Sequence, residues 1–349
     1  MRRFKRLYLH VGSEKTGTTS IQRALHEHRE RLCDLNFYYP KTFAVGRNLL
    51  FATMFHRDPL SIPLWKVGID AYGGSQQSLR DALAVELENE LENVRADNLI
   101  ISSEFLAVRA EVDQLKAYCD ELADETKVVL YLREPVSLLL SVHSTLVKSG
   151  GQGFPALDEL DRGAIPSRIH AQRNISRLLD HFERSDLHLR LFEKERLVNG
   201  SAVDDFVSLI GLDDYLGDFA VGRENVSLSR EAIPLLELVN DYLPPIVDGK
   251  RSTARTRLIE ELAALDSTGM FGRRSLPAKY VELVRKVTEP GNEWVRQNFF
   301  PDQSQLFATA EHAETEAEPE TAALAYAAQL IARAFERVDE LEAAIAEKD

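Results

Sequence analysis

A cluster of glycine, lysine and threonine stands between an apolar stretch and a helical pattern near the start of the chain. The stretch LYLHV (residues 7–11) predicts a buried strand, GSEKTGTT (residues 12–19) follows it, and a helix is expected from about Thr18. Glycine lets a backbone approach an anion closely, and the N–H groups of a first helical turn have no partners within the helix. Because the helix dipole also favours negative charge there, the spacing predicts a phosphate-binding loop.

The order of the residues separates this loop from that of ATPases and kinases. A Walker A loop has the pattern G-x-x-x-x-G-K-[ST], in which lysine follows the second glycine. In this chain Lys15 precedes Gly17 by two positions, so the pattern is not matched. For the stretch taken alone, the alternative is an ordinary strand–turn–helix connection without a ligand.

A second group of residues with the right chemistry for a phosphate follows a later strand. KVVLYL (residues 127–132) predicts that strand, and the segment after it predicts a helix entered through Pro135. Arg133 stands at the end of the strand, and Ser141 follows eight positions later. A guanidinium group binds phosphate through two parallel hydrogen bonds, and a serine hydroxyl adds a donor. The alternatives are a salt bridge for Arg133 and a close helix crossing for Ser141.

The two motifs together resemble those of the sulfotransferases that use 3′-phosphoadenosine 5′-phosphosulfate (PAPS). In that family a K-[ST]-G-T-T loop holds the 5′-phosphosulfate, and an arginine and a serine eight residues apart hold the 3′-phosphate. The residues of this chain that match the family's loop are Lys15, Thr16, Gly17, Thr18 and Thr19. The likeness covers about residues 5–307 and includes segments that look like those of bacterial members, but only the two nucleotide motifs are sharp.

Two further nucleotide contacts are implied by the resemblance alone. The segment LRLFEKERLVNGSAVDDFVSLIGLD resembles the next strand–helix unit of the family, which places Phe192 near the adenine. A core phenylalanine is the alternative. Arg223 and Asn225 loosely match a basic loop that closes over the 3′-phosphate in other members.

Sulfuryl transfer to a hydroxyl group needs a base for the acceptor and a cation for the leaving adenosine 3′,5′-bisphosphate (PAP). In the resembling family, the base is a histidine or glutamate from the strand between the two nucleotide motifs. NLIISSEFL (residues 98–106) occupies that place, so the resemblance implies Glu104 as the general base and Lys15 as the cation. The alternative for Glu104 is a carboxylate that caps a helix or forms a salt bridge.

The chain departs from the cytosolic small-molecule members of the family at two places. Ser102 and Ser103 stand where those enzymes carry Lys-Thr, and Ser20 stands where they often carry tryptophan. Three histidines are alternative bases: His10 on the first strand, His56 in an irregular region and His143 beyond Ser141. We expect His10 to pack within its strand and His143 to face away from Ser141.

The order of the elements predicts an α/β fold. Strands expected at residues 7–11, 98–106, 127–132 and 187–192 alternate with helices, which favours a three-layer α/β/α arrangement with a central parallel sheet. Ligands of such sheets bind at the carboxyl ends of the strands, where the motifs above lie. The resemblance implies the P-loop-NTPase-like sulfotransferase fold in particular.

The last forty residues differ in composition from the rest. Residues 310–349 hold 11 acidic and 3 basic side chains. We expect a sulfotransferase domain over residues 1–307, an acidic linker over 308–321 and an amphipathic helix over 322–349. The apolar residues of that helix step by alternating threes and fours: Leu324, Ala327, Ile331, Ala334, Val338, Leu341 and Ile345. Such a helix pairs with a second copy of the chain or folds back on its own body.

The composition excludes several other classes of protein. The net charge of −14 argues against binding to nucleic acid or to an anionic membrane. No apolar run is long enough to span a bilayer and no secretory signal is visible, so we expect a cytoplasmic protein. The two cysteines, Cys33 and Cys119, show no metal-binding spacing and are expected reduced in or near the core.

The resemblance therefore implies an enzyme with PAPS as co-substrate and no required metal. Its acceptor would be a hydroxyl group of a glycan, a glycolipid or a small molecule, bound by residues 36–75, 149–170 and 243–280. A nucleotide-dependent kinase with a variant phosphate loop is one alternative, although no Walker B pattern is visible. A non-catalytic nucleotide-binding scaffold that acts through its C-terminal helix is the other.

Overall fold

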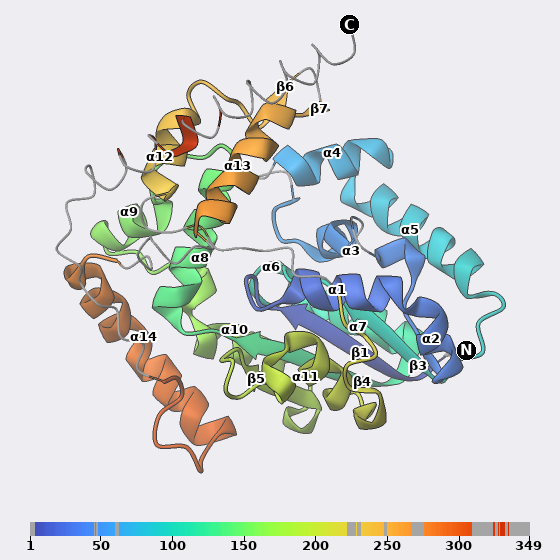
Figure 1. The fold of residues 1–349 in the computed structure, drawn as a ribbon. Helices are drawn as coiled ribbons and strands as arrows, with labels where there is room; N and C mark the ends of the chain where they lie inside the picture. The colour runs from blue at the N-terminus through green and yellow to red at the C-terminus, as the bar shows by residue number, and fades with distance from the viewer. Residues whose placement is uncertain are drawn as a thin grey trace, which may run out of the picture. The chain divides into compact units, whose positions relative to one another are not determined.

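Five parallel strands form the central sheet (Figure 1). The computed structural model describes residues 4–44, 46, 48–59, 63–221, 228, 232–247, 250–266 and 276–308, with Leu324, Ala327, Gln329, Leu330, Ile331 and Ala334 beyond them. The strands lie in the order β2 (Phe37–Tyr38), β3 (Asn98–Ser102), β1 (Phe4–Gly12), β4 (Ala123–Leu132) and β5 (Leu187–Leu191). All neighbouring pairs are parallel, which confirms the expected α/β fold with a central parallel sheet.

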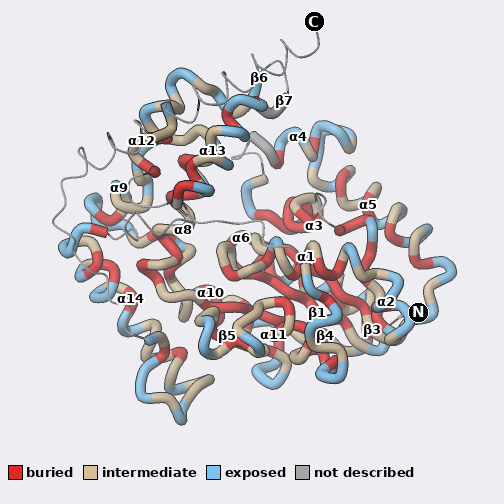
Figure 2. The backbone as a smooth tube through the Cα atoms, viewed as in Figure 1, coloured by how far each residue is buried: buried red, intermediate tan, exposed pale blue. Residues whose placement is uncertain are grey.

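The apolar strands of this sheet are buried on both faces (Figure 2). Leu7, Leu9 and Val11 of β1 join one hydrophobic cluster, whereas Tyr8 joins another on the opposite face. Side chains alternate between the two faces of a strand, so both faces need an apolar cover. This is why a central parallel strand is a nearly continuous apolar run rather than an alternating one.

Helices cover each face of the sheet. The cluster around Tyr8 includes side chains of α1 (Thr18–Glu27), α2 (Arg29–Asp34) and α11 (Ala202–Leu209). The cluster on the other face includes side chains of α3 (Asn48–Phe55), α4 (Pro63–Ala71), α5 (Gln76–Leu91), α6 (Leu106–Arg109), α7 (Val112–Leu122) and α10 (Ala171–Leu179). The sheet between these two groups of helices is the middle layer of a three-layer arrangement.

The chain changes direction across β1. It runs from β1 to β2 at one edge, returns through β3, and then passes β1 to reach β4 and β5 on the other side. The carboxyl ends of β3, β1 and β4 therefore lie next to one another. In open parallel sheets, such a change of direction is where ligands bind.

Several strand boundaries differ from those expected, and one strand of the central sheet was not predicted. Strand β4 begins at Ala123, earlier than predicted, because its polar start is paired: Arg6 Nε of β1 donates to Glu125 Oε2 at 2.8 Å. Strand β3 ends at Ser102, earlier than predicted, and Ser103 N then donates to His10 O at 2.9 Å. The two-residue edge strand β2 was too short to be predicted from a periodic pattern.

The chain divides into two compact units. The first holds residues 1–135, 166–223 and 287–308, and contains the whole parallel sheet. The second holds residues 136–165, 224–286 and 309–349. The acidic linker expected over 308–321 lies outside the described residues except for Ala308, and the division of the chain at residues 307 and 321 stays a prediction.

The second unit is mainly helical. Its elements are α8 (Pro135–Lys148), α9 (Pro155–Asp161), α12 (Ala232–Val239), α13 (Thr253–Asp266), the first turns of α14 (Ala278–Phe299), and a short antiparallel pair, β6 (Ile246–Val247) with β7 (Lys250–Arg251). Its core gathers Val147, Ile233, Leu236, Leu262 and Leu265. The guanidinium of Arg255 donates to the carbonyl oxygens of Val147, Lys148 and Leu243, so it fastens α13 to the end of α8.

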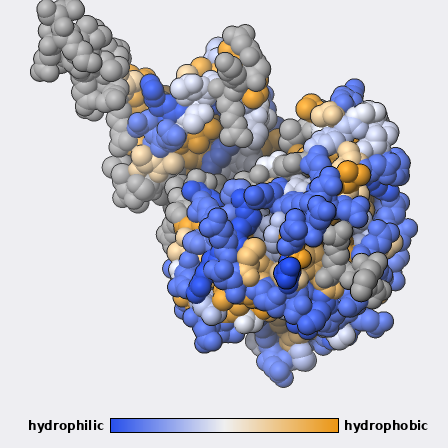
Figure 3. All heavy atoms as spheres, turned by 90° about the vertical axis from the view of Figure 1, so that its right-hand side faces the viewer, coloured by the Kyte–Doolittle hydropathy of each residue, from blue (hydrophilic) through white to orange (hydrophobic). Residues whose placement is uncertain are grey.

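The surface agrees in part with the sequence. On the face that Figure 3 shows, hydrophilic residues predominate and hydrophobic ones form small groups. Both cysteines are free, and Cys119 is buried as expected. Cys33 is exposed, so the expectation that it lies in or near the core was wrong. Among the residues that the structure describes, no helix is long and apolar enough to cross a membrane.

Candidate active site

The loop that follows β1 depends on a glycine at the end of the strand. Gly12 has a φ of +106°, a backbone conformation that favours glycine. A Cβ atom built on Gly12 would lie 2.6 Å from the carbonyl oxygen of Glu104 and 2.9 Å from its Cα. No side chain fits in that space, so the end of β1 contacts the backbone that follows β3. The Gly12–Thr19 loop is thereby held beside Glu104.

Hydrogen bonds fix the course of this loop. The backbone N–H and the hydroxyl group of Ser13 both donate to the carbonyl oxygen of Tyr131 on β4, at 3.1 and 2.9 Å. The hydroxyl group of Thr16 donates to the carbonyl oxygen of Ser13 at 2.6 Å, and Thr16 is fully buried. The side chain of Thr16 therefore braces the loop from within.

Gly17 is the second position at which only glycine fits. Its φ is +77°, and a Cβ atom there would lie 2.7 Å from Ala202 Cβ and 3.2 Å from a ring carbon of Phe192. Helix α1 begins at the next residue, with Thr18 buried and Thr19 exposed. The start of α1 therefore packs against α11 and the end of β5, as a close strand-to-helix turn requires.

Lys15 lies half-buried among four charged side chains. Burial lowers the pKa of Lys15, the carboxylates of Glu14 and Glu104 act in the opposite direction, and Arg133 and Arg168 lower it further. The ammonium group is thus partly desolvated and has one carboxylate, that of Glu104, from a neighbouring strand. Partial desolvation strengthens the attraction between a lysine and an anion that replaces its water.

Arg133 connects the end of β4 to the loop. Its Nη1 donates to the carbonyl oxygen of Lys15 at 2.7 Å, and its guanidinium carbon lies 5.6 Å from the centre of the Phe192 ring. Burial lowers the pKa of this arginine, which keeps its charge because the ordinary value is far above neutrality. A buried guanidinium that holds a loop carbonyl with one nitrogen keeps its other nitrogens for an anion.

A pocket opens beside the loop on the side of Phe192. Its volume is about 430 Å³, enough for the base and sugar of a nucleotide. The residues that line it include Gly17, Ser20, Phe192, Lys194, Ala202 and Val221. Phe192 is thus part of a pocket wall next to Gly17, and its place near an adenine stays a prediction.

Glu104 is held by two amide groups. Its Oε2 accepts hydrogen bonds from Gln22 Nε2 at 2.9 Å and from Asn48 Nδ2 at 3.0 Å. The hydroxyl group of Ser103 donates to the carbonyl oxygen of Asn48 at 2.8 Å, which fixes the start of α3 beside the end of β3. Both donors thus bind one oxygen of the carboxylate, and among the described residues no hydrogen bond reaches Oε1.

The residues around Glu104 were missed in the sequence. Gln22, on the buried side of α1 between Ile21 and Leu25, is 5% exposed. Tyr39 is 1% exposed, and its buried hydroxyl group has no hydrogen-bond partner among the described residues. Burial and then the carboxylate of Glu104 raise the pKa of Tyr39. A polar side chain on an apolar helical face was the available signal for Gln22, whereas nothing in the pattern pointed to Tyr39.

The three histidines considered as alternative bases lie in different environments. His10 is fully buried on β1, where Nδ1 and Ser102 Oγ share a hydrogen bond of 2.8 Å, so the expectation that it packs within its strand is confirmed. Burial lowers the pKa of His10 to about 3. His143 belongs to the second unit, where its Nε2 lies 3.0 Å from Glu237 Oε1. His56 lies near Trp65 and is described below.

For three residues predicted at the 3′-phosphate, the role is not tested by the described residues of the first unit. Ser141 lies on α8 in the second unit, so its pairing with Arg133 on one phosphate stays a prediction. Arg223 and Asn225 lie outside the described residues. The first unit does bring together Lys15, Glu104 and Arg133 at the carboxyl ends of three neighbouring strands.

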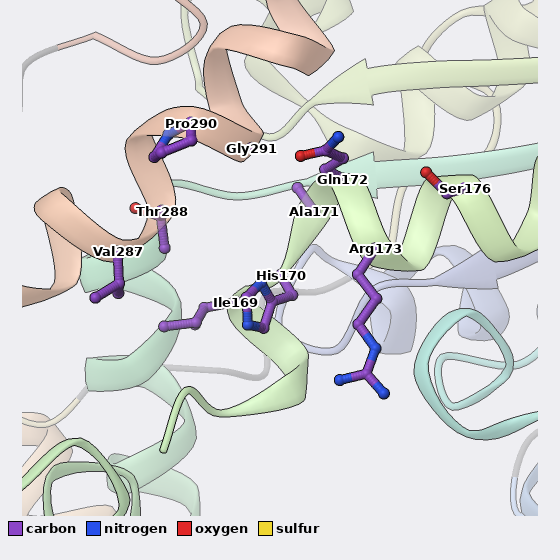
Figure 4. A pocket seen from close by; sticks show the side chains of 10 residues that line it. All are labelled: Ile169, His170, Ala171, Gln172, Arg173, Ser176, Val287, Thr288, Pro290 and Gly291. Carbon is purple, nitrogen blue, oxygen red and sulfur yellow. The ribbon is translucent and has the colours of Figure 1, made fainter. Parts of the chain in front are cut away.

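A second pocket of about 300 Å³ lies between α10 and α14 (Figure 4). Its lining includes His170, Arg173, Ser176, Thr288 and Gly291. Figure 4 shows His170 and Arg173 on one side of the backbone and Gln172 on the other. This pocket shares no lining residue with the one beside Gly17. Among the described residues, no group of three or more His, Cys, Asp or Glu side chains is placed to hold a metal ion.

The comparisons with known proteins give structural likenesses only. No family model matches the chain, and no curated protein does. A sulfotransferase from Alicyclobacillus acidocaldarius is 18% identical with a TM-score of 0.40, over 67% of this chain and 91% of that one. The sulfotransferase domain of the Synechococcus PCC 7002 olefin synthase is 15% identical with a TM-score of 0.36, over 79% of this chain and 98% of that one.

A third solved structure, retinol dehydratase in complex with androsterone and the inactive cofactor PAP, is 14% identical with a TM-score of 0.32. The likeness covers 89% of this chain and 84% of that one. With identities and TM-scores this low, the assignment of a function rests on the residues of the site themselves. The chain is similar in its α/β fold to solved sulfotransferases, with the low identities and TM-scores given above.

Proposed function

We propose that this protein is a sulfotransferase that moves the sulfuryl group of PAPS to a hydroxyl acceptor. One observation carries the proposal. Lys15, Glu104 and Arg133 follow three neighbouring strands, and they are joined by the contact of Gly12 with Glu104 and by the hydrogen bond from Arg133 to the loop. A cation, a base candidate and a second phosphate-binding group thus surround one loop built like an anion site.

The roles follow from this arrangement. The acceptor oxygen forms a bond to sulfur while the bond from sulfur to the bridging oxygen of the 5′-phosphate breaks. Glu104 takes the proton of the acceptor hydroxyl group, for which its Oε1 is the oxygen without a hydrogen bond among the described residues. Lys15 offsets the negative charge that develops on the leaving phosphate.

The nucleotide would lie across the loop toward Phe192. The first turn of α1 offers backbone N–H groups to the 5′-phosphosulfate, and the pocket beside Gly17 has room for the base. The nitrogens of Arg133 that make no hydrogen bond among the described residues would donate to the 3′-phosphate, and the Phe192 ring would offer a stacking surface to the adenine. The acceptor would be a hydroxyl compound such as a glycan, a glycolipid or a small molecule.

Ligand-dependent melting of the full chain tests the proposal. PAP, ADP and ATP with Mg²⁺ are compared, and a ligand at about 100 times its Kd should add about 2.7 kcal/mol to the free energy of unfolding. We expect a rise in Tm with PAP that exceeds the rise with ADP and is lost in Arg133→Ala. A rise with ATP and Mg²⁺ alone would favour a kinase, and no rise with any nucleotide would favour a scaffold.

A further inference from the structure

Two chain segments far apart in sequence are paired beside Glu104. His56 forms an isolated antiparallel bridge with Ala110, and Arg57 N donates to the carbonyl oxygen of Arg109 at 3.2 Å. Glu111 N donates to the carbonyl oxygen of Phe55 at 2.7 Å. The end of α3 is thereby fastened to the end of α6, which brings His56 next to Arg109.

Arg109 is a cation without a partner among the described residues. Its guanidinium group makes no hydrogen bond or ion pair there, and its Nε is shielded from solvent with no acceptor. The guanidinium carbon lies 5.8 Å from the centre of the Trp65 ring. Burial lowers the pKa of Arg109, Glu14 acts in the opposite direction, and Arg168 lowers it further. A half-buried arginine whose guanidinium group makes no hydrogen bond among the described residues keeps its donors for an oxyanion ligand.

The neighbouring arginines are already occupied. Arg57 Nη2 donates to the carbonyl oxygen of Val108 at 2.8 Å, and Arg177 donates to the carbonyl oxygens of Ala107, Val108 and Ala110. Helix α6 is only four residues long, and the carbonyl groups at its end have no hydrogen-bond donors within the helix. The two arginines supply those donors. Arg168 Nη1 lies 3.3 Å from Glu14 Oε2. Arg109 therefore differs from the cations around it.

His56 supplies a second unpartnered donor at the same place. It is 6% exposed, and its Nδ1 accepts a hydrogen bond from Asp58 N at 2.9 Å. Burial and then the charge of Arg109 lower the pKa of His56 to about 4, so the neutral ring carries its proton on Nε2. That Nε2 is buried and has no acceptor in the part of the chain that the structure describes. Its ring centre lies 3.9 Å from that of Trp65, the same aromatic ring that Arg109 contacts.

We infer that Arg109 and His56 bind an oxyanion of the acceptor, so that the acceptor is an acidic hydroxyl compound carrying a carboxylate, sulfate or phosphate group. Next to one tryptophan, His56 Nε2 and Arg109 Nε lack an acceptor among the described residues, and an oxyanion accepts from both. The site is joined to the base: Trp65 packs on Phe105 at 5.5 Å between ring centres, and Phe105 follows Glu104 directly. The inference rests on the proposed function, since it names the class of acceptor for that reaction.

Thermal melting of the full chain with simple oxyanions tests the inference. The chain is saturated with PAP, so that the Gly12–Thr19 loop cannot bind the probe, and inorganic phosphate, glucuronate, glucose or sodium chloride of equal ionic strength is added. We expect phosphate and glucuronate to raise the Tm, whereas glucose and sodium chloride do not. Arg109→Met should abolish that rise, and Arg109→Lys, which keeps the charge without the planar fork, should weaken binding about tenfold or more.

Two further variants sharpen the comparison. His56→Asn keeps an acceptor for Asp58 N and removes the Nε2 donor, so it should weaken oxyanion binding about tenfold. Arg95→Met is the matched control, because Arg95 is exposed before the opposite end of β3. It should bind the oxyanions as the wild type does. Without a ligand, Arg109→Met should melt no lower than the wild type, because the half-buried guanidinium group makes no hydrogen bond or ion pair among the described residues.

The outcomes separate this inference from the proposed function. If PAP raises the Tm but oxyanions do not, or if Arg109→Met keeps the oxyanion response, the inference is overturned and the sulfotransferase proposal stands. A free Arg109→Met chain that melts well below the wild type would assign Arg109 a structural role and also overturn the inference. If PAP fails to bind, the proposed function fails, and the difference between wild type and Arg109→Met still reports the oxyanion site.

Discussion

Gln22 Nε2 donates a hydrogen bond to Glu104 Oε2 at 2.9 Å, and this contact joins the first helix after the Gly12–Thr19 loop to the residue proposed as the base. The same carboxylate oxygen accepts from Asn48 Nδ2. Two neutral donors on one oxygen turn the other oxygen away from them. The contact therefore orients the carboxylate while it leaves one oxygen available for a proton.

Replacing Glu104 by glutamine tests the base directly. Glutamine has the same shape and cannot take the proton, so Glu104→Gln should bind PAP normally and lose turnover by about 10²-fold or more. PAP binding is followed by melting, and turnover by the release of PAP from PAPS. Glu92→Gln, at an exposed position after α5, is the control and should retain turnover. Near-normal turnover of Glu104→Gln would remove it as the base.

Replacing Gln22 by alanine tests the orientation of Glu104. Loss of one donor leaves the carboxylate with Asn48 alone, so Gln22→Ala should lower kcat about tenfold with a smaller change in the KM for PAPS. Gln22→Asn, which keeps an amide on a shorter side chain, should recover part of the loss. Steady-state kinetics at fixed acceptor concentration separates the two parameters. A change in the KM for PAPS alone would instead place Gln22 in nucleotide binding.

Replacing Gly17 by alanine tests the close packing of the loop. Gly17→Ala places a Cβ atom 2.7 Å from Ala202 Cβ, so the start of α1 must shift and PAP binding should weaken with it. Gly74→Ala is a matched control, because Gly74 has a similar φ of +79° and nothing within 4 Å of a built Cβ. A positive φ destabilises both alanine variants by about 1 kcal/mol. The difference between them in Tm and PAP affinity therefore measures the close contact with Ala202 Cβ alone. Equal effects would contradict the packing argument.

Arg133 and Phe192 should act on the nucleotide together. Their guanidinium and ring lie 5.6 Å apart, and each would contact a different part of PAP. We expect Arg133→Lys and Phe192→Ala each to weaken PAP binding about tenfold or more, with a double variant that loses less than the sum of the two free energies. Calorimetric titration with PAP measures the cycle. Strict additivity would show that the two side chains act independently.

His10 should make the protein acid-sensitive. Burial lowers its pKa to about 3 from an ordinary 6.5, so between these values the unfolded chain binds a proton that the folded chain does not. The free energy of unfolding therefore falls as the pH falls through this window, by about 2 kcal/mol between pH 7 and pH 5 from this group. Urea unfolding at the two pH values measures the loss. His10→Asn should show a smaller fall, and an equal fall would assign the acid sensitivity to other groups.

The fold and part of the site could be predicted from the sequence. The loop after β1 was predicted because glycine, lysine and threonine in that order follow an apolar strand, and Arg133 was predicted because it ends a later apolar strand in the place that the resemblance implies. Both signals are local, since they depend on residues within one strand–helix unit. The resemblance to a family supplied Glu104 and Phe192, whose types alone are compatible with core or surface roles.

The residues that hold Glu104 and Trp65 could not be predicted because their roles are set by long-range pairing. Asn48 and Glu104 are brought together by the end of β3, and His56 meets Arg109 only because α3 and α6 end side by side. No periodic pattern in residues 36–75 indicates either contact. For Ser141 the resemblance predicted a role in binding the 3′-phosphate together with Arg133. The two residues belong to different compact units, so that role stays a prediction.

The absence of a side chain at Gly12 bears on how the specificity of the proposed enzyme for its acceptor could change. The donor loop and the proposed base are held in register by two touching backbones, so their separation does not depend on any side chain that substrate selection would alter. In the proposed reaction, residues on α3, α4 and α6 could then be exchanged to suit a new acceptor while the spacing between the loop and Glu104 is conserved.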